Sequence, residues 1–436
     1  MLTKTFRGGV HLRYCKEATA AKPIVELPEP EQVFLPVQQH IGAPAEICVA
    51  VGDRVKLGET IAKAKGFVSV PVHASIAGKV IAIKKLPHAS GKDVMSIVIE
   101  NDHSGAKSLL PVKLLEQWTP TELRELMQQI GLVGMGGAGF PTHVKYQPPE
   151  GKTLQMVILN GAECEPYLTC DHRLMVEQPA DVILGLQAMM QAAGVAVGYI
   201  GIEVNKPDAI RILQQEAASD RRIKVVPLKV KYPQGEEKML IQAITGRVVP
   251  AGGLPADVGV VVNNIATAVT LAQAIKEGLP LISRVVTVTG AVANPQNLRV
   301  RLGTLVSELV DFCGGFSGTP GQVILGGPMT GPAQYRLDLP VVKTTSGVLV
   351  QERGELRQLQ NSTCVRCARC VDVCPYRLMP CLIGKAIEAG DLAQAEAYGV
   401  LDRRECGSCT FVCPAGRPII QNIKSAKTKI LAARKK

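Results

Sequence analysis

The apolar positions of the chain change their spacing several times, and each change marks a region of different predicted structure. From about residue 31 to 101, short apolar runs such as AEICVAV and GKVIAI alternate with turns marked by glycine. Runs of this length between glycines are typical of β-strands. We therefore predict an all-β unit at 31–101, after an irregular lead-in at 1–30.

The next region alternates strands with helices. Residues 120–130 have the pattern of a helix with a Thr N-cap and a Glu in the first turn. The runs QMVILN, VAVGYIGIEV, RIKVVPLKV and VGVVVNN suit buried strands, and helical patterns such as ADVILGLQAMMQAAG and ATAVTLAQAIKEG separate or follow them. This alternation predicts a Rossmann-like α/β layer with a parallel sheet, and we place the domain at 115–250.

The pattern changes twice more before the chain ends. One helix-like stretch, LGTLVSELVDFCGG, stands among the strand-like runs RVVTVTGAV and GQVILGGPMTG, which favours a small β-grasp-like unit at 251–345. Residues 346–360 read as a polar linker, and a cysteine-rich module at 355–436 closes the chain. The predicted fold class is therefore multidomain, with α/β and α+β parts.

Composition and charge narrow the class of protein. The 436 residues suffice for three or four domains of roughly 100–150 residues. The net charge of +11 suggests anionic partners, but no Lys/Arg stretch is interleaved with aromatics, so nucleic acid is not an expected partner. No apolar run of about 18 residues predicts a membrane span, and the first residues lack the apolar run of a signal peptide, so we expect a cytoplasmic protein.

Eight of the 13 cysteines lie between positions 364 and 413, which indicates metal chemistry rather than disulfides. The first four form the motif Cys364-x2-Cys367-x2-Cys370-x3-Cys374-Pro375. In ferredoxins with this spacing, three thiolates surround one [4Fe–4S] cluster and the fourth ligates the other cluster of a pair. Cysteine pairs also bind zinc, but four cysteines at this spacing before a proline favour iron–sulfur.

The second motif, Cys406-x2-Cys409-x3-Cys413-Pro414, is incomplete. A full repeat would have its first cysteine at position 403, where this chain has Arg403. The crossed ligand pattern of paired clusters divides the cysteines into two groups. The first cysteine group is Cys364, Cys367, Cys370 and Cys413, and the second cysteine group is Cys374, Cys406 and Cys409.

Cys381 is our candidate for the ligand that the second group lacks. It follows Cys374 by seven residues, about two helical turns, on the segment that leaves the first motif. The alternative is a buried free thiol beside a cluster with three cysteine ligands. We expect a ferredoxin-like helical module with two [4Fe–4S] clusters, which exchange single electrons.

Two further segments suggest a ligand site. The glycine-rich run at 134–140 lacks a strand before it and has Pro141 after it, so it is not a Rossmann fingerprint. Its clustered amide groups still suit a phosphate, which Lys145 could neutralise. The polar run NGAECEP at 160–166 follows a strand, where open α/β sheets bind ligands, although an ordinary loop is the alternative reading.

Together these segments carry a family resemblance. GLVGMGGAGFPTHVK and NGAECEP resemble flavin-binding segments of the NADH-oxidising flavoprotein subunit of respiratory complex I, and YPQGEE at 232–237 and VNN at 262–264 resemble two later ones in the same order. The β-unit resembles the barrel-sandwich hybrid of lipoyl domains, but Phe67 replaces the modifiable lysine, so we expect a docking module. The whole layout is similar to the C subunit of the Rnf complex, an ion-translocating ferredoxin:NAD⁺ oxidoreductase.

The resemblance implies FMN and NAD(H) as cofactors besides the clusters. It assigns residues to three positions around them. Gly134, Gly136 and Lys145 would face the FMN phosphate and ribityl chain; Asn160, Glu163, Gly235, Glu236, Asn263 and Asn264 would line the flavin; Phe140 would stack on the adenine and Glu165 would lie near the nicotinamide ribose. The chain departs from the flavoprotein pattern at Met135, where the family has Arg, and at Ala162, where it has Asp.

The implied function is electron transfer without an acid–base pair. A flavin bridges the hydride of NADH and the single electrons of clusters. The resemblance implies an oxidoreductase of the translocase type, peripheral on the cytoplasmic face of the bacterial inner membrane. Its partners would be the other subunits of a membrane electron-transport complex, with ferredoxin reached through one of them. The alternatives are a soluble flavin and iron–sulfur reductase, such as a cobalamin reductase, and a cluster-bearing adaptor without flavin.

Overall fold

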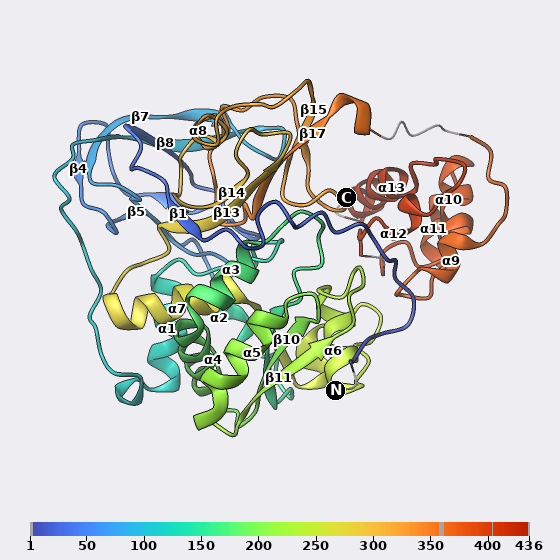
Figure 1. The fold of residues 1–436 in the computed structure, drawn as a ribbon, viewed down its shortest axis with the longest axis horizontal. Coiled ribbons are helices and arrows are strands. Elements are labelled where there is room, and N and C mark those ends of the chain that lie inside the picture. Colours follow the sequence, from blue (N-terminus) through green and yellow to red (C-terminus); the bar gives the residue numbers. More distant parts are fainter. Residues whose placement is uncertain (1–2, 357–361, 403, 435–436) are drawn as a thin grey trace.

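The computed structural model describes residues 3–356, 362–402 and 404–434 (Figure 1). Its strands form four sheets, and a helical module follows them in the chain. Within the described ranges, no helix combines the length and the apolar character needed to cross a membrane.

The N-terminal unit is all-β, as predicted. Its larger sheet has the order β2-β8-β7-β4 and the smaller one the order β3-β5-β6. In the antiparallel pair of β2 and β8, Val33 faces Ile99 and Leu35 faces Ile97, and all four side chains are buried, so one face of this pair builds the core. The strands are β2 (Gln32–Pro36), β3 (Glu46–Ile47), β4 (Arg54–Val55), β5 (Thr60–Lys63), β6 (Val72–His73), β7 (Gly78–Pro87) and β8 (Asp93–Asn101).

The α/β domain contains a parallel sheet of order β11-β10-β9-β12, as the alternating pattern predicted. Val157 and Leu159 of β9 pack in one apolar core, and Ile158 packs in another, so this strand is buried on both faces. The strands are β9 (Met156–Gly161), β10 (Gly198–Glu203), β11 (Ile223–Leu228) and β12 (Val260–Asn264); the helices are α1 (Pro120–Gln129), α2 (Thr142–Lys145), α3 (Cys170–Glu177), α4 (Pro179–Ala193), α5 (Pro207–Glu216), α6 (Glu237–Thr245) and α7 (Ile265–Glu277).

The β-grasp-like unit has a six-stranded sheet of order β1-β14-β13-β17-β15-β16. Helix α8 (Val306–Phe312) lies in the connection between β14 and β15, and its Leu309 is fully buried. The strands are β1 (Ile24–Glu26), β13 (Ser283–Gly290), β14 (Gln296–Arg301), β15 (Pro320–Leu325), β16 (Ala333–Gln334) and β17 (Gly347–Glu352).

Three segments belong to other structural units than the sequence pattern predicted. Strand β12 pairs with β9, so the parallel sheet extends beyond the expected boundary at 250/251. Strand β17, within the expected linker at 346–360, pairs with both β13 and β15. Strand β1, within the expected irregular lead-in, pairs with β14. Each difference arises because the pairing partner is remote in sequence, which local patterns do not report.

The cysteine-rich module is helical and has a small core of its own (Figure 1). Helix α10 packs against α11 and α13, and Ile383, Val400 and Ile423 are fully buried between them. The helices are α9 (Arg369–Asp372), α10 (Pro380–Glu388), α11 (Leu392–Ala397), α12 (Ser408–Phe411) and α13 (Ile419–Ala433).

Candidate functional site

The parallel sheet offers a ligand position between β9 and β12. Strand β9 has β10 on one side and β12 on the other, so the order of the strands reverses there. Asn160 near the end of β9 is in register with Asn264 at the end of β12. Ligands of open α/β sheets bind outside the carboxyl ends of the strands at such a switch point, so this edge is the candidate site.

Both asparagines are held in place by hydrogen bonds. Asn160 donates from Nδ2 to the carbonyl of Gly235 at 2.7 Å. Asn264 is the N-cap of α7, where its Oδ1 accepts from the N–H of Ala266 at 2.8 Å. The sheet edge therefore presents two fixed amide side chains.

The glycine-rich loop closes over this edge. The N–H of Gly134 donates to the carbonyl of Phe140 at 2.9 Å, which ties the two ends of the loop together. A Cβ at Gly136 would stand 3.2 Å from that of Asn264, so the backbone approaches the sheet closely there. Gly136, Gly137 and Ala138 are exposed, and no described residue accepts a hydrogen bond from their N–H groups. Such free amides suit a phosphate.

Lys145 of α2 supplies a positive charge beside the loop. Its Nζ donates to the carbonyl of Val262 at 2.7 Å and lies 3.9 Å from a carboxylate oxygen of Glu237. A Cβ at Gly134 would lie 3.9 Å from the same Nζ. Burial lowers the pKa of Lys145, and Glu237 opposes that shift. An anion at the loop would thus meet a partly desolvated ammonium group.

Two expected flavin-lining residues carry buried oxygens that accept no hydrogen bond within the described chain. Asn263 donates from Nδ2 to the hydroxyl of Tyr146 at 2.6 Å, but its Oδ1 lacks a donor. Glu163 accepts at Oε1 from the N–H of Asp171 at 2.7 Å, and its Oε2 lies 3.8 Å from Lys16 without a hydrogen bond. A buried polar atom without a partner costs about 1–3 kcal/mol, so these atoms fit a polar ligand such as a flavin ring.

A buried carboxyl lies behind the sheet edge. Asp171 accepts at Oδ2 from Nδ2 of Asn264 at 2.6 Å. Burial raises the pKa of Asp171 to about 7, and the nearby charge of Glu163 adds to the shift. The hydrogen bond from Asn264 and the charges of Arg284 and Lys16 oppose it.

Two acidic residues of the expected flavin and nucleotide set have protein partners. Glu236 caps α6 by accepting from the N–H groups of Lys238 and Met239 at 3.0 and 3.1 Å. Glu165 accepts from the N–H of Met329 at 3.0 Å, so it contacts the loop after β15. Both carboxyls are buried, which raises their pKa values. Phe140, the expected adenine contact, is half-buried at the end of the glycine-rich loop.

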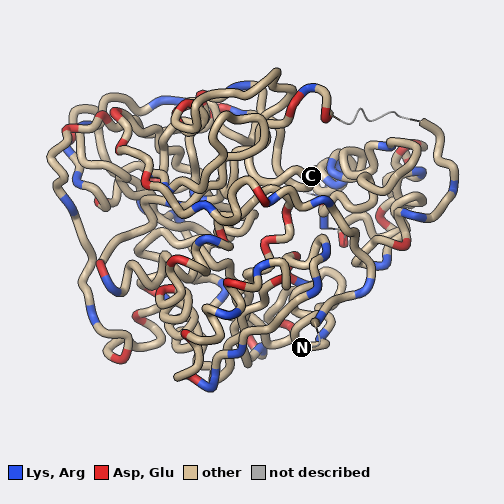
Figure 2. Tube along the Cα trace, viewed as in Figure 1, with Lys and Arg blue, Asp and Glu red and all other residues tan. Residues whose placement is uncertain are grey.

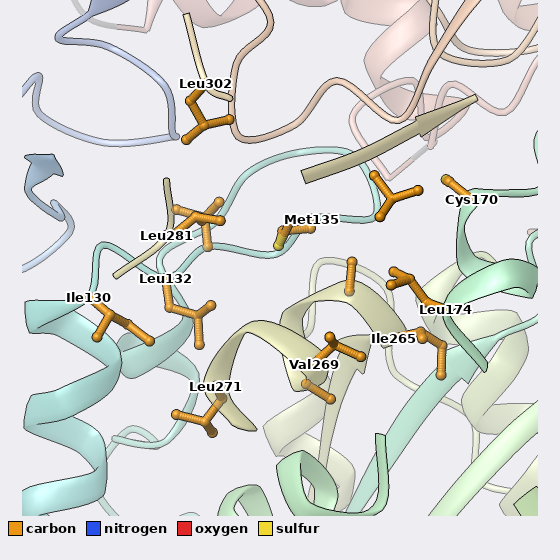
Figure 3. Close-up of a cluster of buried hydrophobic side chains, with 14 of the residues drawn as sticks. Ile130, Leu132, Met135, Cys170, Leu174, Ile265, Val269, Leu271, Leu281 and Leu302 are labelled. Carbon is orange, nitrogen blue, oxygen red and sulfur yellow. The ribbon is translucent and has the colours of Figure 1, made fainter. Parts of the chain in front are cut away.

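The two departures from the flavoprotein pattern point inward. Met135 is 2% exposed, and its side chain joins the apolar cluster that includes Leu132 and Leu281 (Figure 3). Ala162 is fully buried, and its carbonyl accepts from Nζ of Lys206 at 2.6 Å. Position 135 therefore contributes to the core beneath the loop, and position 162 connects the sheet edge to a buried lysine.

Cys381 lies in the pocket of the first cysteine group, whereas we expected it beside the second group. This pocket is lined by Cys364, Cys367, Cys370, Cys381 and Cys413. The physical reason is the turn after Cys374. Helix α10 starts at Pro380 and packs on α13, and this packing places the first turn of α10, with Cys381, beside the first group. Arg403, at the vacant position of the second motif, lies outside the described residues.

The cysteine groups otherwise differ in exposure. In the second group Cys374, Cys406 and Cys409 are all buried, whereas Cys367 of the first group is exposed and Cys364 is half-buried. Within the described ranges, no three Cys, His, Asp or Glu side chains stand close enough together to hold a metal ion. The first group is brought around one pocket, and the thiolate chemistry of both groups suits iron–sulfur.

Sequence reasoning missed three residues of this site: Lys206, Tyr146 and Asp171. Lys206 is 1% exposed and forms an ion pair with Glu203 at 3.6 Å. It follows the end of β10, so the rule that placed a site after β9 could have found it. Tyr146 and Asp171 carried no comparable signal, because only the folded chain brings them to Asn263 and Asn264.

Three family models match consecutive parts of the chain. The RnfC barrel sandwich hybrid domain matches residues 4–104, the Nuo51 FMN-binding domain matches 127–273, and the SLBB domain matches 285–333. The FMN-binding match contains both the glycine-rich loop and β12.

Curated relatives match nearly the whole chain. The C subunit of the Na⁺-translocating ferredoxin:NAD⁺ oxidoreductase complex of Acetobacterium woodii is 47% identical, with 99% of this chain and 98% of the relative covered. The C subunit of the proton-translocating ferredoxin:NAD⁺ oxidoreductase complex of Clostridium ljungdahlii is 45% identical, with 99% and 95% covered. Among solved structures, an NAD⁺-reducing [NiFe]-hydrogenase in the air-oxidised state is similar in fold, with a TM-score of 0.51 and 22% identity over 70% of this chain and 63% of that chain.

Proposed function

The chain belongs to the family of C subunits of ion-translocating ferredoxin:NAD⁺ oxidoreductase complexes, and on this premise we propose that it passes electrons between NAD(H), FMN and iron–sulfur clusters. The observation that carries the proposal is the switch point of the parallel sheet. There the glycine-rich loop, Lys145 and the asparagines of β9 and β12 converge inside the segment matched to an FMN-binding domain.

The residues of the sheet edge have distinct tasks in this proposal. The free amides of Gly136, Gly137 and Ala138 bind the FMN phosphate, and Lys145 neutralises it. Oε2 of Glu163 and Oδ1 of Asn263, which accept no hydrogen bond within the described chain, would accept hydrogen bonds from the polar edge of the flavin. When bound, FMN supplies the conversion between a hydride and single electrons. Asn160 and Asn264, each fixed by a hydrogen bond, would line the flavin and keep the sheet edge rigid.

The contacts of Glu165 and Glu236 give these residues supporting tasks. Glu165 ties the polar segment after β9 to the loop after β15, at the side where the nicotinamide ribose would lie. Glu236 fixes the first turn of α6 and, at 4.0 Å from Arg404, reaches the cysteine module. Gly235 accepts from Asn160, and a Cβ at this position would stand 3.3 Å from Sγ of Cys164, so the glycine lets the loop pack closely against the sheet edge. Phe140 remains the proposed adenine contact.

Two clusters in the cysteine module complete the electron path. We assign the first cluster to Cys364, Cys367, Cys370 and Cys413, and the second to Cys374, Cys406 and Cys409. Cys381 lines the first pocket as a fifth thiol, so in this assignment the second cluster has three cysteine ligands. If Cys381→Ser removed the signal of the second cluster while the first stayed unchanged, this ligand assignment would be incorrect.

The partner of the module is another subunit of the complex. Lys and Arg positions lie along the outer edge of the module (Figure 2). Arg366, Arg369 and Arg377 of this module are exposed. This charge suits an acidic electron carrier. The protein attaches to its membrane complex through such contacts, as a peripheral component on the cytoplasmic face.

Anaerobic purification tests the proposal. Iron, sulfide and FMN are assayed together, and NADH is then added while flavin and cluster absorbance are followed. We expect FMN in the preparation and bleaching of both chromophores. A matched pair of variants, Asn263→Ala in the site and Asn294→Ala at an exposed position after β13, tests the location, since only the first should lower FMN content. Protein that binds FMN but is not bleached by NADH would overturn the oxidoreductase assignment for this chain.

A further inference from the structure

The N-terminal segment at residues 6–12, which we call the strap, lies between the α/β domain and the cysteine module (Figure 1). On one side it pairs with the loop at 231–235. The N–H of Val10 donates to the carbonyl of Tyr232 at 2.7 Å, and the N–H of Tyr232 donates back to Val10 at 2.9 Å. Nζ of Lys231 donates to the carbonyl of Phe6 at 2.6 Å.

The other side of the strap touches the second cysteine group. The N–H of Gly9 donates to the carbonyl of Val373 at 2.8 Å, one residue before Cys374. A Cβ at Gly8 would stand 3.1 Å from the carbonyl oxygen of Cys374, and one at Gly9 would stand 2.5 Å from that of Tyr232. Both glycines have positive φ, so no other residue fits this double contact without strain.

Tyr232 completes the connection from within the α/β domain. It is 2% exposed, and its hydroxyl donates to the carbonyl of Cys406 at 2.7 Å. Three residues further along the same loop, Gly235 accepts from Asn160 and donates to Sγ of Cys164 at 3.2 Å. An apolar cluster of Val10, Cys164, Tyr232 and Cys406 fills the space between these hydrogen bonds.

The first cysteine group differs from the second in exposure. Its Cys367 is exposed, and the neighbouring Val365 is 64% exposed. The contacts described above link the sheet edge at the ends of β9 and β12, which we call the flavin edge, to Cys374 and Cys406, which belong to the second group. Electron transfer through protein weakens steeply with distance, so the group that is packed against the flavin edge exchanges electrons with it first.

We propose that the strap and Tyr232 hold the second cysteine group, rather than the first, against the flavin edge, with Tyr232 as the positioning residue for electron transfer between them. The inference rests on the proposed function and adds an order to it. Electrons pass between the flavin edge and the second group, then the first group, and reach the partner protein at the exposed side of the module. Neither the strap nor Tyr232 changes its own redox state.

The test uses the purified full chain with its cofactors and the variant Tyr232→Phe, which removes only the hydroxyl that meets Cys406. In stopped flow with NADH, we expect flavin reduction at the rate of the unchanged protein and cluster reduction at least several-fold slower. The EPR spectrum of the second cluster should shift, while that of the first should not. Tyr335→Phe, at a side chain that is 84% exposed, is the matched control.

The strap is tested separately with Gly9→Ala, whose new methyl group would collide with Tyr232. The control is Gly91→Ala, at a glycine with nearly the same φ and nothing within 4 Å of the added Cβ. We expect slow cluster reduction in the first variant only, and this variant decides the question if Tyr232→Phe loses FMN. Unchanged cluster reduction and EPR in Gly9→Ala would overturn the inference. Absence of FMN or of flavin bleaching in the unchanged protein would instead refute the proposed function.

Discussion

In the α/β domain the functional residues follow strands that are buried on both faces, whereas in the cysteine module they lie on short helices around a small core. Asn160 and Asn264 are fixed by a four-stranded parallel sheet. The cysteines of the module are carried in part by α9 and α12, which have four residues each. The sheet holds its ligand site by its own packing, but helices this short are not stable by themselves.

The difference implies two kinds of dependence on cofactors. The core of the module includes the cysteine side chains of Cys370, Cys409 and Cys413 among its aliphatic residues. When metal binding completes such a core, its binding free energy becomes folding free energy. We expect the α/β domain to keep its core beneath the sheet edge whether or not FMN is bound, because that core is built by its own apolar residues. Each prediction below tests one side of this contrast.

The largest effect should follow the removal of iron. We expect the module to lose its stable helices after anaerobic chelation, because the short helices then have no ligand bonds to hold them. Hydrogen exchange followed by mass spectrometry should show loss of protection in α10 and α13 and retained protection in β9 and β10. Equal protection of α13 before and after chelation would contradict the contrast between the two regions.

The next effect should come from the buried ion pair of the α/β domain. Lys206→Met removes the ammonium group that pairs with the buried carboxylate of Glu203, which then keeps a hydrogen bond from the N–H of Lys231; breaking a buried ion pair typically costs about 3–5 kcal/mol. Urea denaturation followed at the α/β domain should show this loss. The control is Lys276→Met. Lys276 is half-exposed, and its ion pair with Asp181 should contribute no more than about 1 kcal/mol to the free energy of unfolding. Similar losses in both variants would mean that burial is not what makes Lys206 important.

The titration of Asp171 should contribute to the pH dependence of the free energy of unfolding. Its folded pKa of about 7 lies above its ordinary value of 3.8, so the folded state retains a proton that the unfolded state releases. The stability from this proton is fully present below pH ~4 and is lost as the pH rises to ~7, by up to about 4 kcal/mol. Asp171→Asn should therefore flatten the decline of stability between pH 5 and 7.5 in chemical denaturation. If stability declined with pH equally steeply in Asp171→Asn, a group other than Asp171 would be responsible for the decline.

The smallest effect concerns a single contact of the flavin site. Lys145→Ala removes the ammonium beside the glycine-rich loop, and a hydrogen bond to a charged group contributes about 1.5–3 kcal/mol. We expect FMN to bind roughly 10- to 100-fold more weakly in fluorescence titration, with unchanged protection of the module in hydrogen exchange. Lys152→Ala, at an exposed lysine paired with Asp257, should leave the affinity for FMN unchanged.

The sequence by itself predicted the elements whose signals are local. The strands β9, β10, β11 and β12 were visible as apolar runs, and α1 was visible through its Thr119 cap. The cysteine motifs were visible because each motif gathers three or four cysteines within a short stretch of the chain. The polar segment after β9 was visible because the carboxyl end of a strand is a general location for ligands.

The tertiary structure alone decided which remote segments meet. It placed β12 beside β9 to form the switch point and β17 within the sheet of β13 and β15, and it brought Cys381 to the first cysteine group. It also placed the strap between Tyr232 and Cys374. These contacts join segments up to several hundred residues apart. Their stability depends on shape and hydrogen bonding between surfaces that form only in the folded chain, so no local pattern encodes them.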